Sequence, residues 1–321
     1  MPNKNLRPQT FKDFVGQSKL IQTLKAMIKS AQIKQQPVSH ILLYGSPGTG
    51  KTTLATIIAN ETKSKIHYVQ GSNIEKKADL INVLSVINEN DIVFIDEIHS
   101  VNKNVVEFLY GAMEEFVFDL IIGVEENAKA MRMKIKPFTL IGATTKINLI
   151  AQPLKERFGY LARIVNYNES DIERILDLSA KKMNLSLTDE LKHKIASYSR
   201  YIPRLANNLL ERIQDFALAQ NDGVIDNKIV DKTFKALDLY EYGLLKDHIE
   251  YLQILYHGFN YKYASLDTIS GLVLHSKETI MNEIEPVLLY LKLIDKTSRG
   301  RKITKKGIEY LYKHRLIKKE Q

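Results

Sequence analysis

A glycine-rich loop at residues 45–52 limits what this chain can fold into. It has the sequence Gly45-Ser46-Pro47-Gly48-Thr49-Gly50-Lys51-Thr52. Largely apolar residues 40–44 precede it like a buried strand, and apolar residues at helical spacing follow it from Leu54 to Ile58. Glycine permits the chain path that turns several backbone amides toward one anion. The segment therefore predicts a phosphate-binding loop between a strand and a helix of an α/β sheet.

Two side chains at the end of this loop suit a nucleoside triphosphate. Lys51 offers an ammonium group to the β and γ phosphates, and Thr52 offers a hydroxyl group to a magnesium ion. The helix that begins here points the positive end of its dipole at the same phosphates. We therefore expect ATP and Mg²⁺ at this site.

A second acidic element follows a further apolar run. Residues 92–95 are apolar, and Asp96 and Glu97 come directly after them. The carboxyl ends of strands in α/β sheets are where ligands bind. Asp96 suits magnesium, and Glu97 suits the activation of an attacking water, because this hydrolysis needs an in-line nucleophile more than covalent chemistry. The two elements together predict an ATP hydrolase.

Length and composition favour a soluble, cytoplasmic protein of two or three domains. The chain has 321 residues and no cysteine, which excludes disulfides and thiolate zinc sites and fits a reducing compartment. Its first residues lack the apolar segment of a signal peptide, and no stretch approaches the roughly twenty apolar residues of a membrane span. We expect no membrane contact.

The positive charge is concentrated at the carboxyl end. The formal net charge is +9, and the eleven basic and three acidic residues from Lys292 onward contribute +8 of it. A localised basic region predicts a nucleic-acid partner. A solvent-exposed tail that keeps the protein soluble is the alternative, because it would show the same excess of basic residues.

The apolar patterns divide the chain into three parts. Residues 1–167 alternate strand and helix patterns, as in a parallel sheet covered by helices. Residues 168–240 show helix patterns alone. Residues 241–321 show three helix patterns and then the basic turn Arg299-Gly300-Arg301, which suggests a winged-helix domain with this turn as the wing.

Two local signals refine the helices. Ser170 and Glu173 have the spacing of a capping box, which predicts that Ser170 starts the first helix of the second part. Pro286 interrupts the last helix pattern and should kink or restart that helix.

Six segments, in this order, resemble the RuvB branch-migration motors, a family of AAA+ ATPases that act on Holliday junctions. They are Leu6-Arg7-Pro8, Asp96-Glu97-Ile98-His99, Gly142-Ala143-Thr144-Thr145, Pro153-Leu154-Lys155-Glu156-Arg157-Phe158-Gly159, Pro203-Arg204-Leu205-Ala206-Asn207 and Arg299-Gly300-Arg301. The resemblance covers nearly the whole chain. It implies an α/β fold with an AAA+ P-loop parallel-sheet domain, a small all-helical lid domain and a C-terminal winged-helix domain.

The resemblance implies three further roles in hydrolysis. Thr145 matches the polar sensor between the two phosphate-binding strands. Arg157 looks like the arginine finger that reaches the nucleotide of a neighbouring subunit, a role that suits a guanidinium because it can donate to several γ-phosphoryl oxygens. A surface arginine paired with Glu156 is the alternative for Arg157. Arg204 resembles the second sensor at the start of a lid helix.

Other positions match residues that line the nucleotide in the family. The implied nucleotide-binding set is Leu6, Arg7, Gly48, Gly50, Lys51, Thr52, Thr53, Glu114, Glu115, Phe116, Tyr167 and Arg204. For residues 114–116 an exposed helix end is the alternative.

Residues from Asp119 to Lys136 resemble the protruding hairpin that binds RuvA in the family. Ile121 and Ile122 stand before its tip, and Met131 and Met133 after it. Apolar side chains on a projecting hairpin are explained by a partner surface. An ordinary buried edge hairpin remains the alternative.

The basic wing is implied to hold duplex DNA through Lys296, Arg299 and Arg301. Lys296 stands where the family has an arginine, Lys155 replaces another arginine, and Tyr201-Ile202 replaces a Gly-Thr pair. A lysine keeps the attraction to phosphate but loses the planar fork of arginine. Phosphate contacts carry little sequence preference.

The resulting interpretation is a homo-hexameric, ATP-driven motor that moves Holliday junctions with RuvA in recombination, DNA repair and the SOS response. RuvC is left open as a further partner in a resolvasome. A DExH helicase would share Asp96-Glu97-Ile98-His99 but needs a second α/β lobe, which the chain beyond Tyr167 lacks. A nucleotide switch that uses ATP for assembly, such as an initiator, is the rival from another class.

Overall fold

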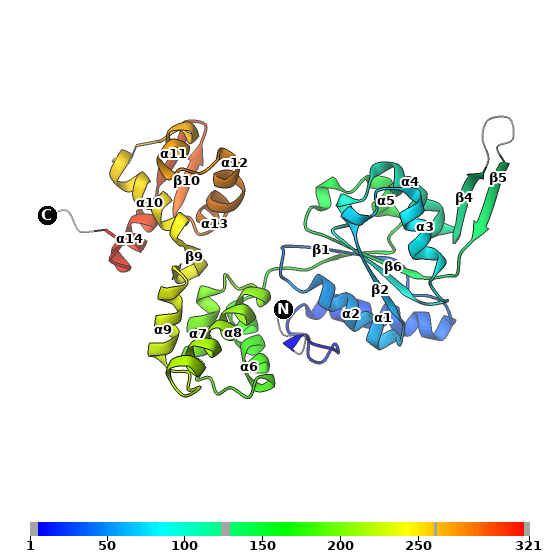
Figure 1. The fold of residues 1–321 in the computed structure, drawn as a ribbon, viewed down its shortest axis with the longest axis horizontal. Helices are drawn as coiled ribbons and strands as arrows, with labels where there is room; N and C mark the ends of the chain where they lie inside the picture. The colour runs from blue at the N-terminus through cyan, green and yellow to red at the C-terminus, as the bar shows by residue number, and fades with distance from the viewer. Residues whose placement is uncertain (1–5, 123–128, 260–261, 318–321) are drawn as a thin grey trace. The chain divides into compact units, whose positions relative to one another are not determined.

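The computed structural model describes residues 6–122, 129–259 and 262–317 (Figure 1). The chain forms two compact units. The sheet unit contains residues 1–187 and 201–210, and the helical unit contains residues 188–200 and 211–321. In the described residues no helix combines the length and the apolar content that crossing a bilayer requires.

A five-stranded parallel sheet forms the centre of the sheet unit, in the order β2-β3-β6-β1-β7. Its strands are β1 (Ile41–Tyr44), β2 (Ile66–Gln70), β3 (Ile92–Asp96), β6 (Thr139–Thr144) and β7 (Tyr160–Arg163). The strand β6 lies between β1, which leads into the glycine loop, and β3, which ends at Asp96. The predicted parallel α/β sheet is confirmed.

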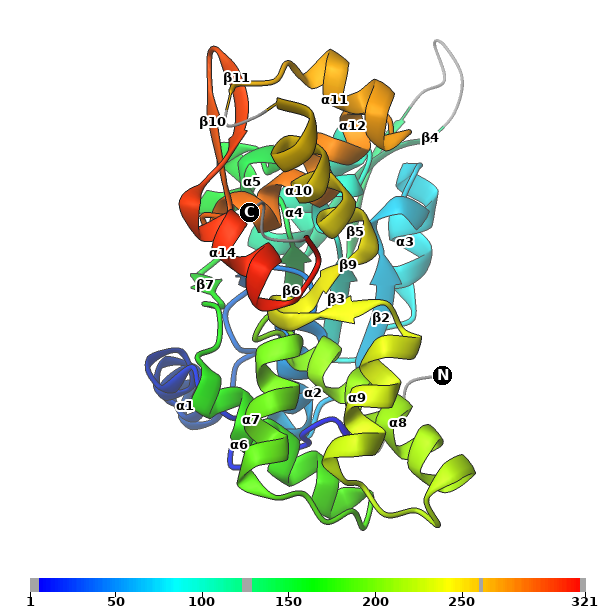
Figure 2. The ribbon, with the colours of Figure 1, turned by 90° about the vertical axis from the view of Figure 1, so that its left-hand side faces the viewer.

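Helices cover both faces of this sheet (Figure 1 and Figure 2). The helices α1 (Ser18–Lys34) and α2 (Lys51–Thr62) pack on one face, against side chains such as Leu43 and Phe94. The helices α3 (Lys77–Ser85), α4 (Lys103–Glu114) and α5 (Gln152–Glu156) pack on the other, against Leu42 and Val93. Adjacent strand residues enter opposite cores, so the strands are apolar on both faces.

The strands β4 (Val117–Ile122) and β5 (Lys129–Lys134) form a separate antiparallel hairpin. Figure 1 shows it projecting from the rest of the sheet unit. Met133 packs against the core, whereas Met131 is 48% exposed. The predicted hairpin is present, and its tip at residues 123–128 and the side chains of Ile121 and Ile122 lie outside the described residues.

The next helix, α6 (Glu169–Lys182), begins two residues earlier than a cap at Ser170 predicts. Asn168 caps it, because the Asn168 Oδ1 atom accepts the backbone N–H of Asp171 at 2.8 Å. Ser170 instead donates its hydroxyl to that same oxygen. The prediction that Ser170 is the cap was wrong, since an asparagine two residues upstream caps the helix equally well.

The lid helices continue with α7 (Asp189–Tyr198), α8 (Pro203–Gln220) and α9 (Asn227–Ala236). A turn joins the last two helices, with positive φ at Asp222 and Gly223. A short pair, β8 (Leu239–Tyr240) and β9 (Leu244–Leu245), follows around a 3-10 turn. Strands of two residues leave no pattern in the sequence, so they were not predicted.

The rest of the helical unit is a winged helix, as predicted. Its helices are α10 (Lys246–Phe259), α11 (Leu266–Val273), α12 (Lys277–Thr279), α13 (Glu285–Tyr290) and α14 (Lys305–Lys313). The wing is the hairpin of β10 (Ile294–Thr297) and β11 (Gly300–Ile303). A π-helical turn at Ile280–Ile284 precedes α13, which restarts with Pro286 in its first turn. Proline lacks the N–H that the preceding helix would use.

Candidate nucleotide site and basic wing

The glycine loop has the backbone of an anion cradle. Gly48 and Gly50 have φ angles of 76° and 104°, values that side chains disfavour. The helix α2 begins at Lys51, and no side chain caps it, so the amides of its first turn, which includes Thr52 and Thr53, remain available to a ligand. Free amides at a helix N-terminus bind phosphate.

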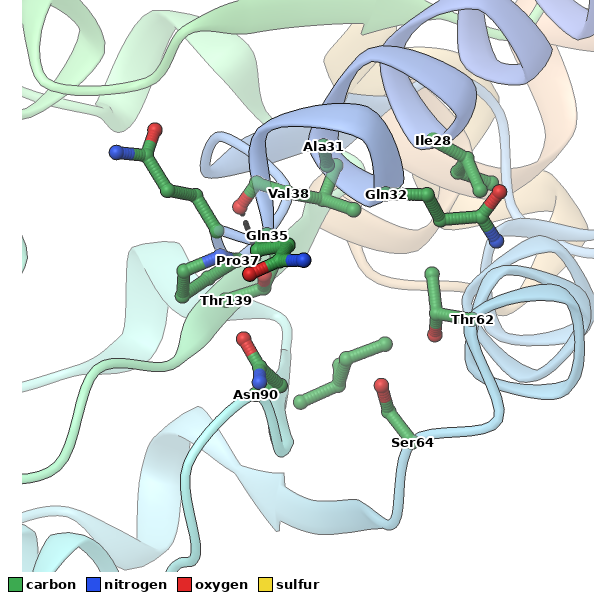
Figure 3. Close-up of a pocket in the computed structure, with 12 residues that line it drawn as sticks. Ile28, Ala31, Gln32, Gln35, Pro37, Val38, Thr62, Ser64, Asn90 and Thr139 are labelled. Carbon is green, nitrogen blue, oxygen red and sulfur yellow. Dashed lines mark hydrogen bonds between the residues drawn. The ribbon is translucent and has the colours of Figure 1, made fainter.

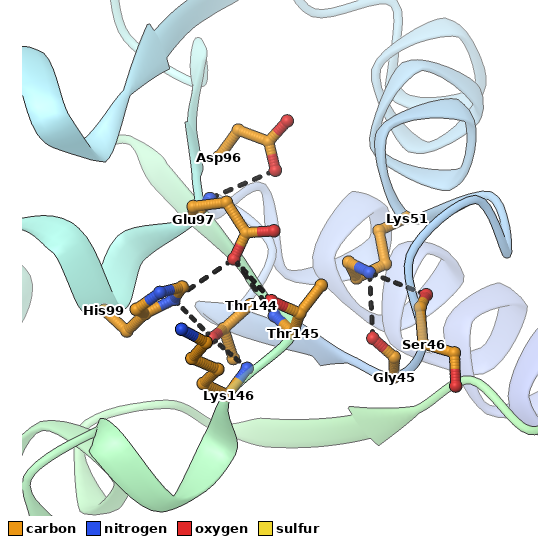
Figure 4. Close-up of polar contacts among 9 residues, drawn as sticks. All are labelled: Gly45, Ser46, Lys51, Asp96, Glu97, His99, Thr144, Thr145 and Lys146. Carbon is orange, nitrogen blue, oxygen red and sulfur yellow. Dashed lines mark hydrogen bonds and ion pairs between the residues drawn. The ribbon is translucent and has the colours of Figure 1, made fainter. Parts of the chain in front are cut away.

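Lys51 lies inside this loop. Its Nζ atom donates to the carbonyl oxygens of Gly45 at 2.9 Å and Ser46 at 3.0 Å (Figure 4). Burial lowers its pKa, the negative charges of Glu97 and Asp96 oppose that shift, and Arg204 adds to it. Four charged groups predicted for the site therefore interact at one place in the fold.

The strand β3 delivers the two carboxylates. Asp96 is its last residue, and its Oδ1 atom accepts the backbone N–H of Glu97 at 3.1 Å. Glu97 turns the chain with a φ of 47°, an unusual value for a residue with a side chain. Its carbonyl lies so close to Gly71 that a Cβ atom at position 71 would overlap it. Gly71 is a site residue that the sequence did not indicate.

The carboxylate of Glu97 is held by residues that follow β6 and β3. Its Oε2 atom accepts the backbone N–H of Thr145 at 3.1 Å and the Thr145 hydroxyl at 3.0 Å, and it lies 3.1 Å from His99 Nδ1. The structure thus brings Thr145 to Glu97. His99 belongs to the segment that carried the family resemblance, but no role was predicted for it.

Arg204 and Tyr167 reach the glycine loop from the other side. The Arg204 backbone N–H is 3.4 Å from the Gly48 carbonyl oxygen. The buried Tyr167 hydroxyl donates to the Thr49 carbonyl at 3.0 Å, and burial raises the pKa of this phenol well above its usual range. Both residues therefore contact the backbone of the glycine loop.

Leu6 and Arg7 lie beside the first lid helix. Their carbonyl oxygens both accept from Lys182 Nζ at 3.3 Å, and the side chain of Leu6 is buried whereas Arg7 is exposed. The aromatic ring that approaches the loop from this end of the chain is Phe14, which lies 3.3 Å from the position of a Cβ on Gly50.

Arg157 and Glu114 lie at the opposite end of the sheet from the chain's own glycine loop. Met113 O is 2.9 Å from the Nε2 atom of His40, which directly precedes β1. The glycine loop follows β1, whose four residues span about 13 Å. The structure therefore does not bring Arg157, Glu114, Glu115 and Phe116 to the phosphate-binding loop of the same chain.

Specific partners hold this second group. The guanidinium of Arg157 binds Glu114, with Nε 3.3 Å from Oε1, and donates through NH1 to the Pro153 carbonyl at 2.9 Å. Glu156, the alternative partner, accepts from Gln152 instead. Glu115 pairs with Arg132 of the hairpin.

Phe116 is partly buried and packs against the core. Its ring makes edge contacts with His40 and Phe138. The exposed helix end that was the alternative for residues 114–116 describes Glu114 and Glu115, which are exposed where α4 ends, but it does not describe Phe116.

The basic wing contains an ion pair that sequence reasoning missed. The side chain of Glu285 is 1% exposed, and its oxygens bind Arg301 Nε at 2.6 Å and Lys296 Nζ at 2.8 Å. Burial raises the pKa of Glu285, but hydrogen bonds from Arg301 and Lys296 outweigh it, so its pKa lies below the ordinary value. Arg299 is exposed at the turn. Lys296 and Arg301, two of the three predicted DNA contacts, are thus bound to Glu285, whereas Arg299, the third, is not part of this ion pair.

A separate pocket of about 220 Å³ lies at the amino ends of β3 and β6, away from the glycine loop (Figure 3). It is lined by Ile28, Ala31, Gln32, Gln35, Gln36, Pro37, Val38, Thr62, Ser64, Asn90, Ile92 and Thr139. None of these side chains is charged, so the pocket offers no counter-charge to phosphate.

Comparisons with known proteins cover the whole fold. Residues 6–164 match the P-loop domain of the Holliday junction DNA helicase RuvB, residues 167–240 match the RuvB AAA lid domain, and residues 241–312 match the RuvB C-terminal winged helix domain. These matches follow one another along the chain in the order that the sequence predicted.

Relatives that match along nearly their whole length are also RuvB proteins. The Holliday junction branch migration complex subunit RuvB of Mycoplasmopsis synoviae is 66% identical over 311 residues, or 97% of this chain and 98% of the relative. The RuvB of Mycoplasmopsis pulmonis is 51% identical over 96% of this chain and 98% of the relative. The solved structure of the Thermotoga maritima RuvB Holliday junction branch migration motor is 32% identical, with a TM-score of 0.79, over 99% of this chain and 100% of that one. This chain belongs to the RuvB family.

Proposed function

We propose that this protein is an ATP-driven motor that moves the branch point of Holliday junctions. The observation that carries the proposal is the convergence of Lys51, Asp96, Glu97 and Arg204 at an uncapped glycine loop. The relatives that match the chain along its length are named as branch migration subunits and as a branch migration motor.

The site residues have distinct roles in this proposal. The loop amides and Lys51 bind the phosphates of ATP. Thr52 and Asp96 supply the hydroxyl and carboxylate oxygens that Mg²⁺ prefers, and the ion would neutralise phosphate charge when bound. Glu97 orients and deprotonates the attacking water, and Thr145 holds Glu97 in place.

Hydrolysis also requires a neighbouring copy in this proposal. Arg157 and residues 114–116 lie at the sheet edge opposite the chain's own glycine loop, so they act on a nucleotide only if a second subunit presents it. A closed hexameric ring satisfies this requirement for every subunit. Arg157 would then stabilise the charge on the γ-phosphoryl group of the neighbour.

The other proposed contacts are with DNA and RuvA. The winged helix binds the duplex backbone through basic side chains such as Arg299, largely without sequence preference. RuvA binds the hairpin between Asp119 and Lys136, on which Met131 is exposed. Arg204, at the start of α8, links the nucleotide state to the lid. A contact with RuvC and the cytoplasmic location stay predictions.

The test is strand exchange on a synthetic four-way junction. We expect movement only with this protein, RuvA, ATP and magnesium present together. Glu97→Gln should retain ATP binding and lose both hydrolysis and movement, because the amide cannot accept the proton of water. Stoichiometric ATP binding without turnover on DNA would instead favour a nucleotide switch.

A further inference from the structure

His40 is a buried histidine whose ring is fixed by two backbone groups. It directly precedes β1 and is 8% exposed. Its Nδ1 atom accepts the backbone N–H of Leu140, in β6, at 2.8 Å. A ring nitrogen that accepts carries no hydrogen, so the hydrogen of the neutral imidazole is on Nε2. Burial lowers the pKa of His40, which keeps the ring neutral. The ring therefore has one defined donor, Nε2–H.

That donor reaches the end of α4. Nε2 lies 2.9 Å from the Met113 carbonyl oxygen, which accepts its hydrogen. The helix α4 ends at Glu114, and the carbonyl groups in the last turn of a helix have no partner within the helix. His40 supplies a partner from the start of β1, one residue before Glu114 in the sequence. It thus joins the end of α4 to the central sheet.

The same ring packs against the turn by which the chain leaves α4. Phe116 has a φ of 54°, a value that residues with side chains disfavour. Its ring meets that of His40 edge-on, with the ring centres 6.3 Å apart, and Phe138 packs against both rings. His40 therefore contacts the segment around Glu114 on both sides of that residue.

The backbone beside His40 contacts the segment that carries Arg157. The His40 carbonyl oxygen accepts the N–H of Tyr160, three residues after Arg157, at 3.3 Å. The approach is close, because a Cβ atom on Gly159 would lie 2.7 Å from the Cβ atom of Ser39. His40 thus contacts both of the segments that meet in the Arg157–Glu114 ion pair.

We infer that His40 is a positioning residue for Arg157. Its ring holds the end of α4, and its backbone holds the segment after Arg157. The ion pair with Glu114 can break and form again, but the point from which the guanidinium reaches a neighbouring subunit stays fixed. The inference rests on the proposed function, in which Arg157 acts on the nucleotide of the next subunit.

Two amide variants each keep one of the two hydrogen bonds of the ring. In His40→Asn the amide oxygen takes the place of Nδ1 and still accepts the Leu140 N–H, but the side chain ends before the position of Nε2. In His40→Gln the amide nitrogen takes the place of Nε2 and still donates to the Met113 carbonyl group. Each variant loses one buried hydrogen bond, so urea unfolding should show a similar loss of stability in both.

Their ATPase rates should differ. We expect His40→Asn to lower kcat of assembled rings by about 10-fold, the effect of one buried hydrogen bond, and His40→Gln to stay within about threefold of the parent protein. KM for ATP should change by no more than about twofold in either, because the glycine loop is intact. Equal kcat values in the two variants would overturn the inference, because activity would then follow stability and not the bond to Met113.

Mixed rings locate the defect of His40→Asn. This variant keeps its glycine loop, so adding Lys51→Ala protein, which keeps Arg157 in place, should raise turnover above the sum of the separate rates. Adding Arg157→Ala protein should not, because neither copy then presents a well-placed Arg157. Recovery with Arg157→Ala, or no recovery with Lys51→Ala, would overturn the role of His40.

The mixture of Lys51→Ala with Arg157→Ala tests the proposed function separately. Recovery in this mixture supports an Arg157 that acts between subunits, whatever the His40 variants do. Without recovery there, the proposed role of Arg157 fails, and the role of His40 fails with it. Recovery there together with unchanged kcat in His40→Asn would overturn the role of His40 alone.

Discussion

Arg157 lies against Tyr110 of its own chain, with the guanidinium carbon 4.1 Å from the centre of the ring. Glu114 binds the same guanidinium at its edge, with Nε 3.3 Å from Oε1 and NH2 3.3 Å from Oε2. The proposed finger is therefore engaged within its own subunit. Before it donates to a phosphate in a neighbour, it must leave Glu114 or share its hydrogens with it.

We predict that Glu114→Gln raises the ATPase rate of assembled rings. Glu114 is 54% exposed, and such an exposed pair contributes up to about 1 kcal/mol, or a rate change of up to about fivefold. Steady-state hydrolysis with junction DNA and RuvA measures this. The family positions instead imply that Glu114 lines the nucleotide, and weaker ATP binding in the variant would support that role.

We predict that Arg157→Ala binds ATP but does not hydrolyse it, even in rings. Mixing it with Lys51→Ala protein should partly restore turnover, because some interfaces then combine an intact loop from one copy with an intact Arg157 from another. The measurement is ATPase rate against mixing ratio at constant total protein. A rate that never exceeds the sum of the two separate variants would contradict a finger that acts between subunits.

The wing residues should separate into two kinds. Arg301→Met leaves the buried carboxylate of Glu285 without its main partner, so we expect a loss of about 3–5 kcal/mol in the stability of the winged helix. Arg299→Ala should leave stability unchanged and reduce the salt slope of duplex binding by about 0.9 for one lost phosphate contact. Urea unfolding and binding at several salt concentrations measure these effects. Equal stability of both variants would contradict the structural role of Arg301 in pairing with Glu285.

His248 predicts a pH dependence of stability. Burial and then the charge of Arg200 lower its pKa from 6.5 to about 4, against an opposing effect of Asp247. Between these pH values the unfolded chain binds a proton that the folded chain does not, so stability falls as the pH drops from 6.5 toward 4. The loss reaches up to about 3 kcal/mol.

His248→Asn should flatten this dependence. The amide oxygen replaces Nδ1 as the acceptor of the Leu245 N–H, now 3.1 Å away, but does not titrate in this range. Urea unfolding at pH 7 and pH 4.5 measures the difference. His257→Asn, an exposed histidine on the same helix, is the control, and an equal flattening there would contradict the assignment to His248.

The sequence could predict the sheet unit and much of its site because those signals are local. The glycine loop, the apolar run before Asp96 and the helix spacing after Thr52 each lie within a few neighbouring residues. The strand order that puts β6 between β1 and β3 agrees with the family pattern, which placed Thr145 between the two phosphate-binding strands.

What could not be predicted depends on contacts between distant residues. Glu285 looks like an ordinary surface charge before Pro286, and only the fold of the wing brings Arg301 and Lys296 to it. The contact of Arg157 with Glu114 joins residues 43 positions apart. Ser170 was chosen as a cap by spacing, yet Asn168 was an equally suitable residue nearby.

Gly71 carries a practical consequence for mutational scanning. Because a Cβ atom at position 71 would overlap the Glu97 carbonyl oxygen, any substitution there, even alanine, pushes the peptide that carries Glu97. Position 71 should therefore tolerate amino-acid substitution as poorly as the glycine loop does, although residue 71 contributes no reactive group. A deep mutational map of this family would identify position 71 as part of the reaction centre through shape alone.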